Sequence, residues 1–382
     1  MKKSLFALLV STFIPAAALA ASTIPSTSPS LNRKVRNLGM GNVGVSILGT
    51  HDSAAFYNPA GLNDLEKSQL RFLTITGEVG DNAFGLIADA IDFGKDIDDA
   101  SSDNERIGVL NQFIQARTGE FQYFRLNVEL INYTRKNFAV GLVLDEQLDM
   151  SFRNQAFPQF DMRTIGNITT YVAFAQGFWD GGLQVGMTFK PTLRFAMNES
   201  DQQITYSDVT TENADGDPII LDQFKNIYDE RQFRIPVDVG LKSKLSGFFD
   251  NKFVEGFDPM LGLTWQDVGD MNFAPAQGNG QTLNFGASLN PKLGKFQNSW
   301  AIELRGINQE RPLISKLHIG AEFKLPAILA VRGGLSQGYL TAGLTIDLRF
   351  FSLDAAIYKE EIGVNTREAG NLRYAATASF KI

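Results

Sequence analysis

The chain has 382 residues, a formal net charge of −7 and no cysteine. The lack of cysteine excludes disulfide frameworks, thiolate zinc sites and cysteine nucleophiles. Because binding to phosphate backbones needs clustered Lys and Arg, the acidic balance also argues against a nucleic-acid partner.

Residues 1–20 are typical of a secretory signal peptide. Lys2 and Lys3 form a basic start, an apolar run occupies residues 5–14, and Ala18-Leu19-Ala20 supplies a small-residue cleavage site. We therefore predict cleavage after Ala20 and export of the protein. No later run of about 18 apolar residues is present, so the sequence predicts no membrane-spanning helix.

A glycine motif comes next, at residues 37–46, NLGMGNVGVS. Gly39, Gly41 and Gly44 have the G-x-G-x-x-G spacing of a dinucleotide-binding loop, and Asp64 lies twenty residues after the last glycine. That loop needs a strand before it and a helix after it. Here a Ser/Thr/Pro-rich stretch precedes the motif, and a glycine and a proline interrupt the residues after it. We therefore predict no nucleotide and no other cofactor, and we interpret Asp64 only as a polar residue at the entry to the first strand.

Residues 83–118 form an insertion with helical spacing. Its apolar positions recur at intervals of three or four residues, which predicts two short amphipathic helices. These positions are Phe84, Ile87 and Ile91, then Ile107, Leu110 and Ile114. Two roles remain open for them: a helical hairpin packed on the loop surface, or a lid or hydrophobic docking ledge at the mouth of a barrel.

The rest of the chain alternates with a period of two residues. Over residues 340–350, Leu340, Ala342 and Leu344 alternate with polar or small residues, so the segment has one apolar and one polar face. Fourteen segments of this kind lie near 68–79, 121–133, 137–149, 165–178, 182–196, 231–245, 257–268, 281–291, 297–307, 313–325, 327–336, 338–349, 350–360 and 371–382.

Alternation alone fits either a soluble sandwich, with the apolar face inside, or a membrane barrel, with the apolar face in lipid. Three features favour the barrel. Many segments exceed the roughly 5–6 residues usual for soluble strands, the sequence ends with Phe380 and Ile382 on an apolar face, and short turns alternate with long polar loops such as 198–230. The predicted fold is therefore all-β: a transmembrane antiparallel β-barrel of about 14 strands over residues 67–382.

Charged residues of both signs recur on the polar faces. Most are expected to form cross-strand ion pairs that hold the strand register, while a subset would pair with an inserted N-terminal segment or with the anionic head of a ligand. The lumen or ligand candidates are Arg125, Glu129, Lys190, Arg194, Arg305, Lys316, His318, Glu322 and Arg349.

The sequence predicts neither catalysis nor a metal site. His51 and His318 are its two histidines, and it contains no G-x-S-x-G nucleophile motif. We expect His318 to belong to a hydrogen-bond network of the lumen.

Residues 38–62, LGMGNVGVSILGTHDSAAFYNPAGL, resemble the N-terminal signature of the FadL-like outer-membrane proteins. That family includes long-chain fatty acid transporters and the related PorV- and TraF-like barrels, and residues 331–363 look more like the latter branch. The residues that match the signature are Gly39, Gly41, Gly44, Asp52, Asn58, Pro59, Ala60 and Gly61.

The resemblance implies a barrel in the bacterial outer membrane, surrounded by its lipid, with residues 21–66 folded inside as a plug or hatch. It also implies passive uptake of a hydrophobic small molecule, either fatty-acid-like or an aromatic hydrocarbon. The alternative is a scaffold barrel that transports nothing and binds a protein of a secretion or assembly system.

Overall fold

The computed structural model describes residues 33–153, 159–197, 202–205, 231–274, 277–293, 296–326 and 328–382. The predicted signal peptide, residues 1–20, and residues 21–32 of the predicted plug lie outside these described residues. No described helix is long and apolar enough to cross a membrane.

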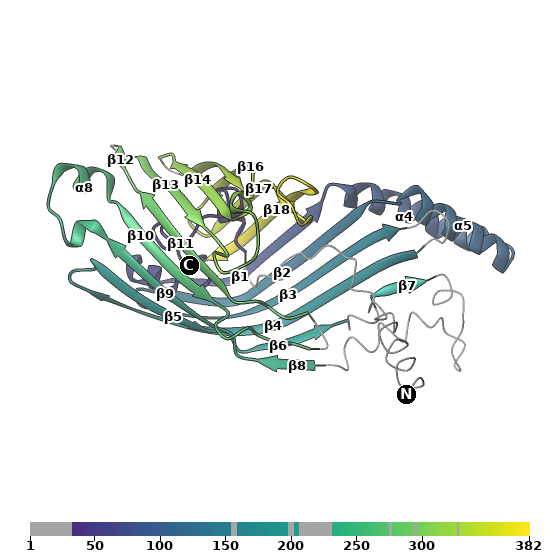
Figure 1. The fold of residues 1–382 in the computed structure, drawn as a ribbon, viewed down its shortest axis with the longest axis horizontal. Helices are drawn as coiled ribbons and strands as arrows, with labels where there is room; N and C mark the ends of the chain where they lie inside the picture. Colours follow the sequence, from purple (N-terminus) through teal and green to yellow (C-terminus); the bar gives the residue numbers. More distant parts are fainter. Residues whose placement is uncertain are drawn as a thin grey trace, which may run out of the picture.

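The described strands form one closed antiparallel sheet, in which β1 pairs with both β18 and β2 (Figure 1). The strands are β1 Gln69–Gly80, β2 Phe121–Arg135, β3 Phe138–Arg153, β4 Gln159–Phe178, β5 Leu183–Phe189, β6 Thr192–Ala196, β7 Gln203–Thr205, β8 Arg231–Arg234, β9 Val237–Lys244, β10 Met260–Gln266, β11 Thr282–Leu289, β12 Lys292–Leu293, β13 Phe296–Leu304, β14 Leu317–Lys324, β15 Leu329–Ser336, β16 Tyr339–Asp347, β17 Phe351–Glu361 and β18 Gly370–Lys381.

Within the described residues these segments make fourteen barrel strands, which confirms the predicted fold. Two barrel strands are each divided by a proline, Pro191 between β5 and β6 and Pro236 between β8 and β9. Proline has no N–H for the ladder, so pairing is interrupted there. The short strands β7 and β12 extend the ladder beside β4 and β13.

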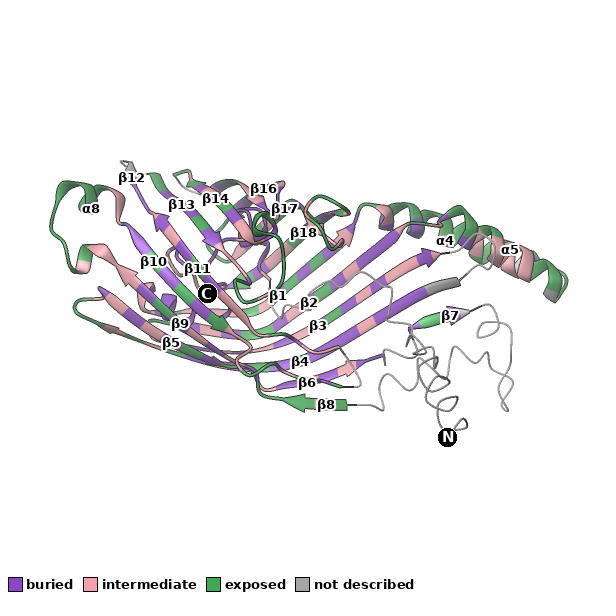
Figure 2. Cartoon of the chain, in the orientation of Figure 1, coloured by how far each residue is buried: buried purple, intermediate pink, exposed green. Residues whose placement is uncertain are grey.

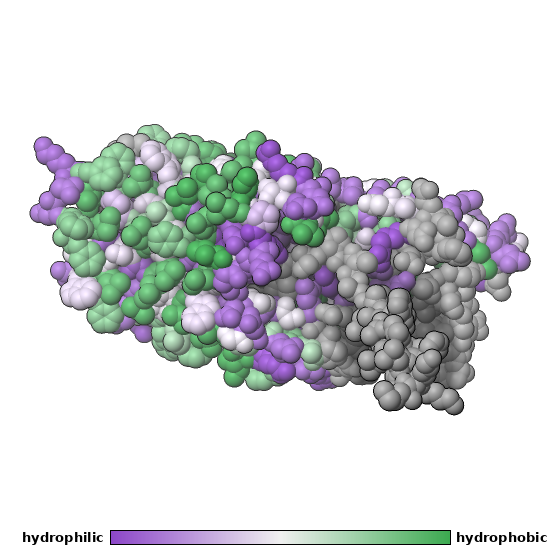
Figure 3. Space-filling model, viewed as in Figure 1, coloured by the Kyte–Doolittle hydropathy of each residue, from purple (hydrophilic) through white to green (hydrophobic). Residues whose placement is uncertain are grey.

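The two faces of the barrel differ in polarity. Along β10, Leu261, Leu263 and Trp265 point outward and are about 40% exposed, whereas Met260 and Thr264 point inward and are buried. Figure 2 shows this alternation on the strands, and Figure 3 shows apolar residues spread over the surface of the strand region in that view. An antiparallel barrel with apolar side chains outside and polar ones inside is the architecture of a transmembrane barrel, which decides against the soluble sandwich.

The two ends of the barrel also differ. At the end where β1 begins, β2 and β3 are joined through Lys136 and Asn137, and β16 and β17 through residues 348–350. At the other end, β1 and β2 are joined by helices α4 Asn82–Asp99 and α5 Asp103–Ala116, which confirm the predicted helical insertion (Figure 1).

The segment predicted near 313–325 includes residues that lie before its strand. Residues 313–316 form the helical turn α9 Leu313–Lys316, and β14 begins only at Leu317. Leu313 and Ile314 are exposed in this turn, so the apolar alternation that suggested a strand comes partly from loop residues.

Candidate functional site

Residues 33–66, which we call the inner segment, lie inside the barrel, where Figure 1 draws them in purple. The segment contains α2 Val35–Leu38, α3 Ala54–Tyr57 and the 3-10 helix η1 Pro59–Asp64. Apart from Asn42, its residues are buried over 34–47 and 53–62, whereas residues 48–52 are half-exposed. The chain therefore fills part of the lumen before it enters β1.

Each glycine of the G-x-G-x-x-G motif stands where a side chain would clash. A Cβ atom on Gly39 would lie 2.7 Å from the Cα of Gly343, and one on Gly41 would lie 2.1 Å from the carbonyl oxygen of Ile319. Gly41 also has a φ of 66°, in the left-handed region. A Cβ on Gly44 would lie 2.2 Å from the ring of Tyr57. The motif thus allows the backbone to turn tightly and to approach the wall closely.

The wall presents glycines of its own at these contacts. A Cβ atom at any of seven strand glycines would come closer than 3.0 Å to the inner segment. They are Gly177 of β4, Gly186 of β5, Gly240 of β9, Gly262 of β10, Gly320 of β14, Gly334 of β15 and Gly343 of β16. Glycine weakens a strand interior, so its recurrence on the inward face of several strands is a signal of close backbone approach that our sequence reasoning did not use.

The glycine motif does bind an anion, but the anion is a carboxylate of the wall. The backbone N–H groups of Gly44, Val45 and Ser46 donate to Glu303 of β13, with distances to Oε1 of 3.0, 2.7 and 3.1 Å. Successive N–H groups of this kind form a concave anion-binding nest. Glu303, which is absent from the predicted site residues, is the anion that these N–H groups bind.

The Asn58-Pro59-Ala60-Gly61 box closes the other half of the segment. The Asn58 side chain accepts a hydrogen bond from the Ala60 N–H at 3.1 Å. Its amide donates to the carbonyl of Val45 at 2.7 Å and to that of Leu241 in β9 at 3.0 Å. One asparagine therefore caps η1, joins it to the glycine motif and fixes both to the wall.

Asp64 is an anchor, which corrects its interpretation as only a polar residue at the start of the first strand. Its carboxylate is paired with Lys242 and, at 3.0 Å, with Lys244, both of β9, and it accepts from the Gly49 N–H at 3.0 Å. Burial opposes the ionisation of Asp64, but the two ammonium groups outweigh burial and lower its pKa to about 2. The carboxylate is therefore charged at neutral pH.

Asp52 of the predicted motif accepts a hydrogen bond from the Thr50 hydroxyl at 2.5 Å. Burial opposes its ionisation, but the guanidinium groups of Arg71 and Arg36 more than offset burial and hold the pKa of Asp52 well below its ordinary value. The half-exposed stretch 48–52 thus carries a fixed negative charge.

The first residues of the inner segment carry cations that meet acids of the wall. Arg36 donates from Nε and Nη2 to the two oxygens of Glu322, at 2.9 and 2.8 Å. Lys34 is paired with Glu129, and Arg33 is paired with Glu360 and, at 3.1 Å, with Glu78. The bidentate Arg36 contact fixes orientation as well as position.

Four of the nine predicted lumen candidates bind the inner segment directly. Glu129 and Glu322 pair with Lys34 and Arg36, Arg305 donates to the Asn42 carbonyl at 2.6 Å, and His318 Nδ1 lies 2.8 Å from the Gly41 carbonyl oxygen. Three others are held within the wall or its loops. Arg125 pairs with Asp145 and Glu78, Lys190 with Asp238 and Asp267, and Arg194 binds Asn167 and Asn279.

The last two candidates lie outside the strands. Lys316 is half-buried at the end of α9 and donates to the carbonyl of Ile307, and Arg349 is exposed in the turn between β16 and β17. The period-two pattern continues through these loop residues, which is why the sequence placed both on strand faces.

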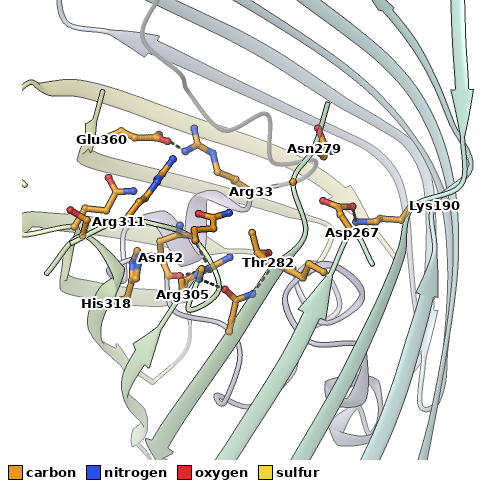
Figure 4. Close-up of a pocket in the computed structure, with 17 residues that line it drawn as sticks. Arg33, Asn42, Lys190, Asp267, Asn279, Thr282, Arg305, Arg311, His318 and Glu360 are labelled. Carbon is orange, nitrogen blue, oxygen red and sulfur yellow. Dashed lines mark hydrogen bonds and ion pairs between the residues drawn. The ribbon is translucent and has the colours of Figure 1, made fainter. Parts of the chain in front are cut away.

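A small chamber of about 120 Å³ borders the inner segment (Figure 4). Arg33 and Asn42 line it from the inner segment, and Lys190, Arg305 and Arg311 line it from the wall and loops. Among the described residues, Arg33 and Lys190 have carboxylate partners, whereas Arg305 and Arg311 have none within 4.0 Å. Arg305 and Arg311 therefore make no close ion pair with a described carboxylate, although Glu303 and Glu360 act on them at longer range and Glu360 and Asp267 also line the chamber.

Two more cavities lie along residues 48–52 of the inner segment, with volumes of about 280 and 500 Å³. Both are lined by Arg36, Thr50, His51 and Lys324, whereas the chamber is lined by Arg33 and Asn42. Different stretches of the inner segment thus border separate hollow spaces in the lumen.

No protein-family model matches the chain, nor does any curated protein. Solved structures of similar fold include the CymD monoaromatic hydrocarbon channel, with a TM-score of 0.46 and 10% identity over 94% of this chain and 98% of that one. The Ralstonia pickettii toluene transporter TbuX has a TM-score of 0.46 and 12% identity over 94% and 98%. The Pseudomonas putida toluene transporter TodX has a TM-score of 0.46 and 9% identity over 93% and 99%.

Replacing Glu303 with Gln should weaken the contact between the glycine motif and the wall, while a side chain of nearly the same size still fills the space. A neutral amide gives up the charge-assisted hydrogen bonds to three N–H groups, so the free energy of local opening should fall by about 1.5–3 kcal/mol. Hydrogen exchange of amides 44–46, in protein reconstituted into vesicles, measures this directly. The exposed Glu66→Gln is the matched control, and equal exchange in the two variants would contradict the role of Glu303.

The Asp64 anchor should fail in acid. Because the pKa of Asp64 is lowered in the folded state from 3.8 to about 2, its contribution is complete above about pH 4 and is lost as the pH falls toward 2. By linkage this contribution is about 2 kcal/mol. The free energy of local opening around residues 49 and 64 should be higher in the native chain than in Asp64→Asn above about pH 4. The two values should converge as the pH falls toward 2. A constant difference between the two would rule the mechanism out.

Proposed function

We propose that the protein is a passive channel of the bacterial outer membrane for hydrophobic compounds, in which the inner segment acts as a hatch. The observation that carries the proposal is the position of this segment within a lumen that has hollow spaces along it. The resemblance of residues 38–62 to the FadL-like signature supports the hydrophobic nature of the ligand.

Two halves of the inner segment are held differently, which supports a hatch that opens in part. Residues 53–65 bring Phe56, Tyr57 and Leu62 into an apolar cluster with Tyr171 and Val143 of the wall. The Phe56 and Tyr171 rings meet edge to face at 4.7 Å. Residues 33–47 also meet the wall through glycines and ion pairs, but they bring no aromatic side chain to their apolar clusters. We propose that this first half moves, with the half-exposed residues 48–52 as the hinge.

Between the two ligand classes that the sequence left open, the chamber favours one with an anionic head. Arg305 and Arg311 make no ion pair within 4.0 Å with a described carboxylate, so a carboxylate entering the chamber could form charge-assisted hydrogen bonds with both. A pure hydrocarbon would gain nothing from these two groups. We therefore propose a fatty-acid-like ligand.

Deleting residues 38–62 should open the channel, because it removes the backbone that crosses the lumen. In planar lipid bilayers the deletion variant should pass a steady ionic current, whereas the native chain should be closed or conduct only briefly. Unchanged conductance would show that the inner segment is not a hatch. If the deletion variant conducts but the native chain takes up no apolar compound in cells, the hatch proposal would be supported and the transport proposal refuted.

Replacing both Arg305 and Arg311 with Ala should weaken the uptake of a fatty acid but leave that of toluene unchanged. Two lost charge-assisted contacts of about 1.5 kcal/mol each correspond to roughly a hundredfold in affinity. Initial uptake of radiolabelled oleate and toluene into cells that carry each variant measures the difference. Arg349→Ala, in an exposed turn, is the control. An equal loss for both compounds would contradict the anionic-head proposal.

A further inference from the structure

Helix α4 carries an apolar stripe on its exposed side. The stripe consists of Phe84, Ile87 and Ile91, which are 57%, 51% and 62% exposed. Intervals of three and four residues place these side chains on one face of the helix. Lys95 lies on the same face one turn later and ends the stripe with a charge.

The other faces of α4 already have their partners. Leu86 packs in a cluster with Ile114 of α5 and Phe152 of β3, and the rings of Phe93 and Phe113 lie 4.4 Å apart. Asp89, Asp92 and Asp96 occupy a third face, where Asp89 pairs with Arg117. Because the contacts with α5 and β3 hold the helix in place, the stripe is not required for the packing of the hairpin.

The stripe continues the membrane-facing surface of the barrel. The Phe84 ring meets Tyr374 of β18 edge-on at 5.8 Å. Tyr374 points outward and pairs in register with Ile357 of β17 and Val79 of β1. Ile357 is itself 40% exposed on the outer face. The first turn of α4 therefore rests on the edge of the lipid-facing belt, and Ile87 and Ile91 extend that surface by two turns.

We propose that α4 is a membrane-interface helix whose stripe is buried among lipid acyl chains at the rim of the barrel. Continuity with the lipid-facing belt identifies lipid as the occupant, because acyl chains already cover the neighbouring Tyr374 and Ile357. The acidic face then points away from the hydrocarbon, as an amphipathic helix at an interface requires. The role of the stripe is independent of the hatch and of any ligand. Of the two roles left open for the hairpin, the proposal assigns a ledge that holds lipid.

The cysteine-free chain allows a direct test by site-directed spin labelling. Single variants Ile87→Cys, Asp96→Cys and Leu263→Cys carry a nitroxide on the stripe, on the acidic face and in the middle of β10. Each is reconstituted into phosphatidylcholine vesicles, and the accessibility of the label to oxygen, which partitions into lipid, and to a water-soluble nickel chelate is measured.

The label of Ile87→Cys should resemble that of Leu263→Cys, with an oxygen-to-nickel accessibility ratio several-fold above that of Asp96→Cys. The two reference labels show in the same experiment that the barrel has inserted. A label at position 87 as open to nickel as the one at position 96 would mean that the stripe faces water. A label reached by neither reagent would mean that protein covers it. Either result overturns the proposal, and Ile91→Cys repeats the measurement one turn further along.

Discussion

The interior of this protein depends on the close approach of two backbones, that of the inner segment and that of the barrel wall. Gly39 meets Gly343 and Gly41 meets Gly334, and a Cβ atom at any of these contacts would be too close to its neighbour. Side chains at these positions would hold the segment away from the wall. Close approach also takes backbone polar groups out of water, so they need partners. Glu303 and Asn58 supply them for the segment.

Ion pairs with the wall then fix which way the inner segment runs in the lumen and where it lies along the barrel axis. Its first residues are cationic and meet Glu78, Glu129, Glu322 and Glu360, whereas Asp64 near its end meets Lys242 and Lys244. A segment shifted along the wall would bring cations away from acids and leave buried charges unpaired, which is costly. Because desolvation consumes much of the attraction in such pairs, their main effect is to specify one placement.

The sequence predicted the barrel well because alternation follows directly from a wall with lipid on one side and a polar lumen on the other. The same rule failed at Leu313 and Arg349, where loop residues continue the alternation beyond the strands. The glycine motif revealed a backbone that turns and approaches another surface, but not which surface. Its partner Glu303 lies more than 250 residues away in the chain. Only the closed register of the strands brings the two together, and Lys242 reaches Asp64 for the same reason.

A polar lumen is what makes a movable hatch physically reasonable. If residues 33–47 leave the wall, the buried Arg36 and Glu322 must each exchange their partner for water. Val35, Leu38 and Met40 also leave their apolar clusters, but these residues bring no aromatic ring to the wall. Residues 53–65 are different, since their release would expose Phe56, Leu62 and the face of Tyr171. Apolar area costs about 25 cal/mol per Å² to expose, and the rings of Phe56 and Tyr57 contribute large apolar side chains to that half. Under the proposed function, the distribution of polar and apolar contacts along one short segment would separate a part that opens from a part that stays anchored.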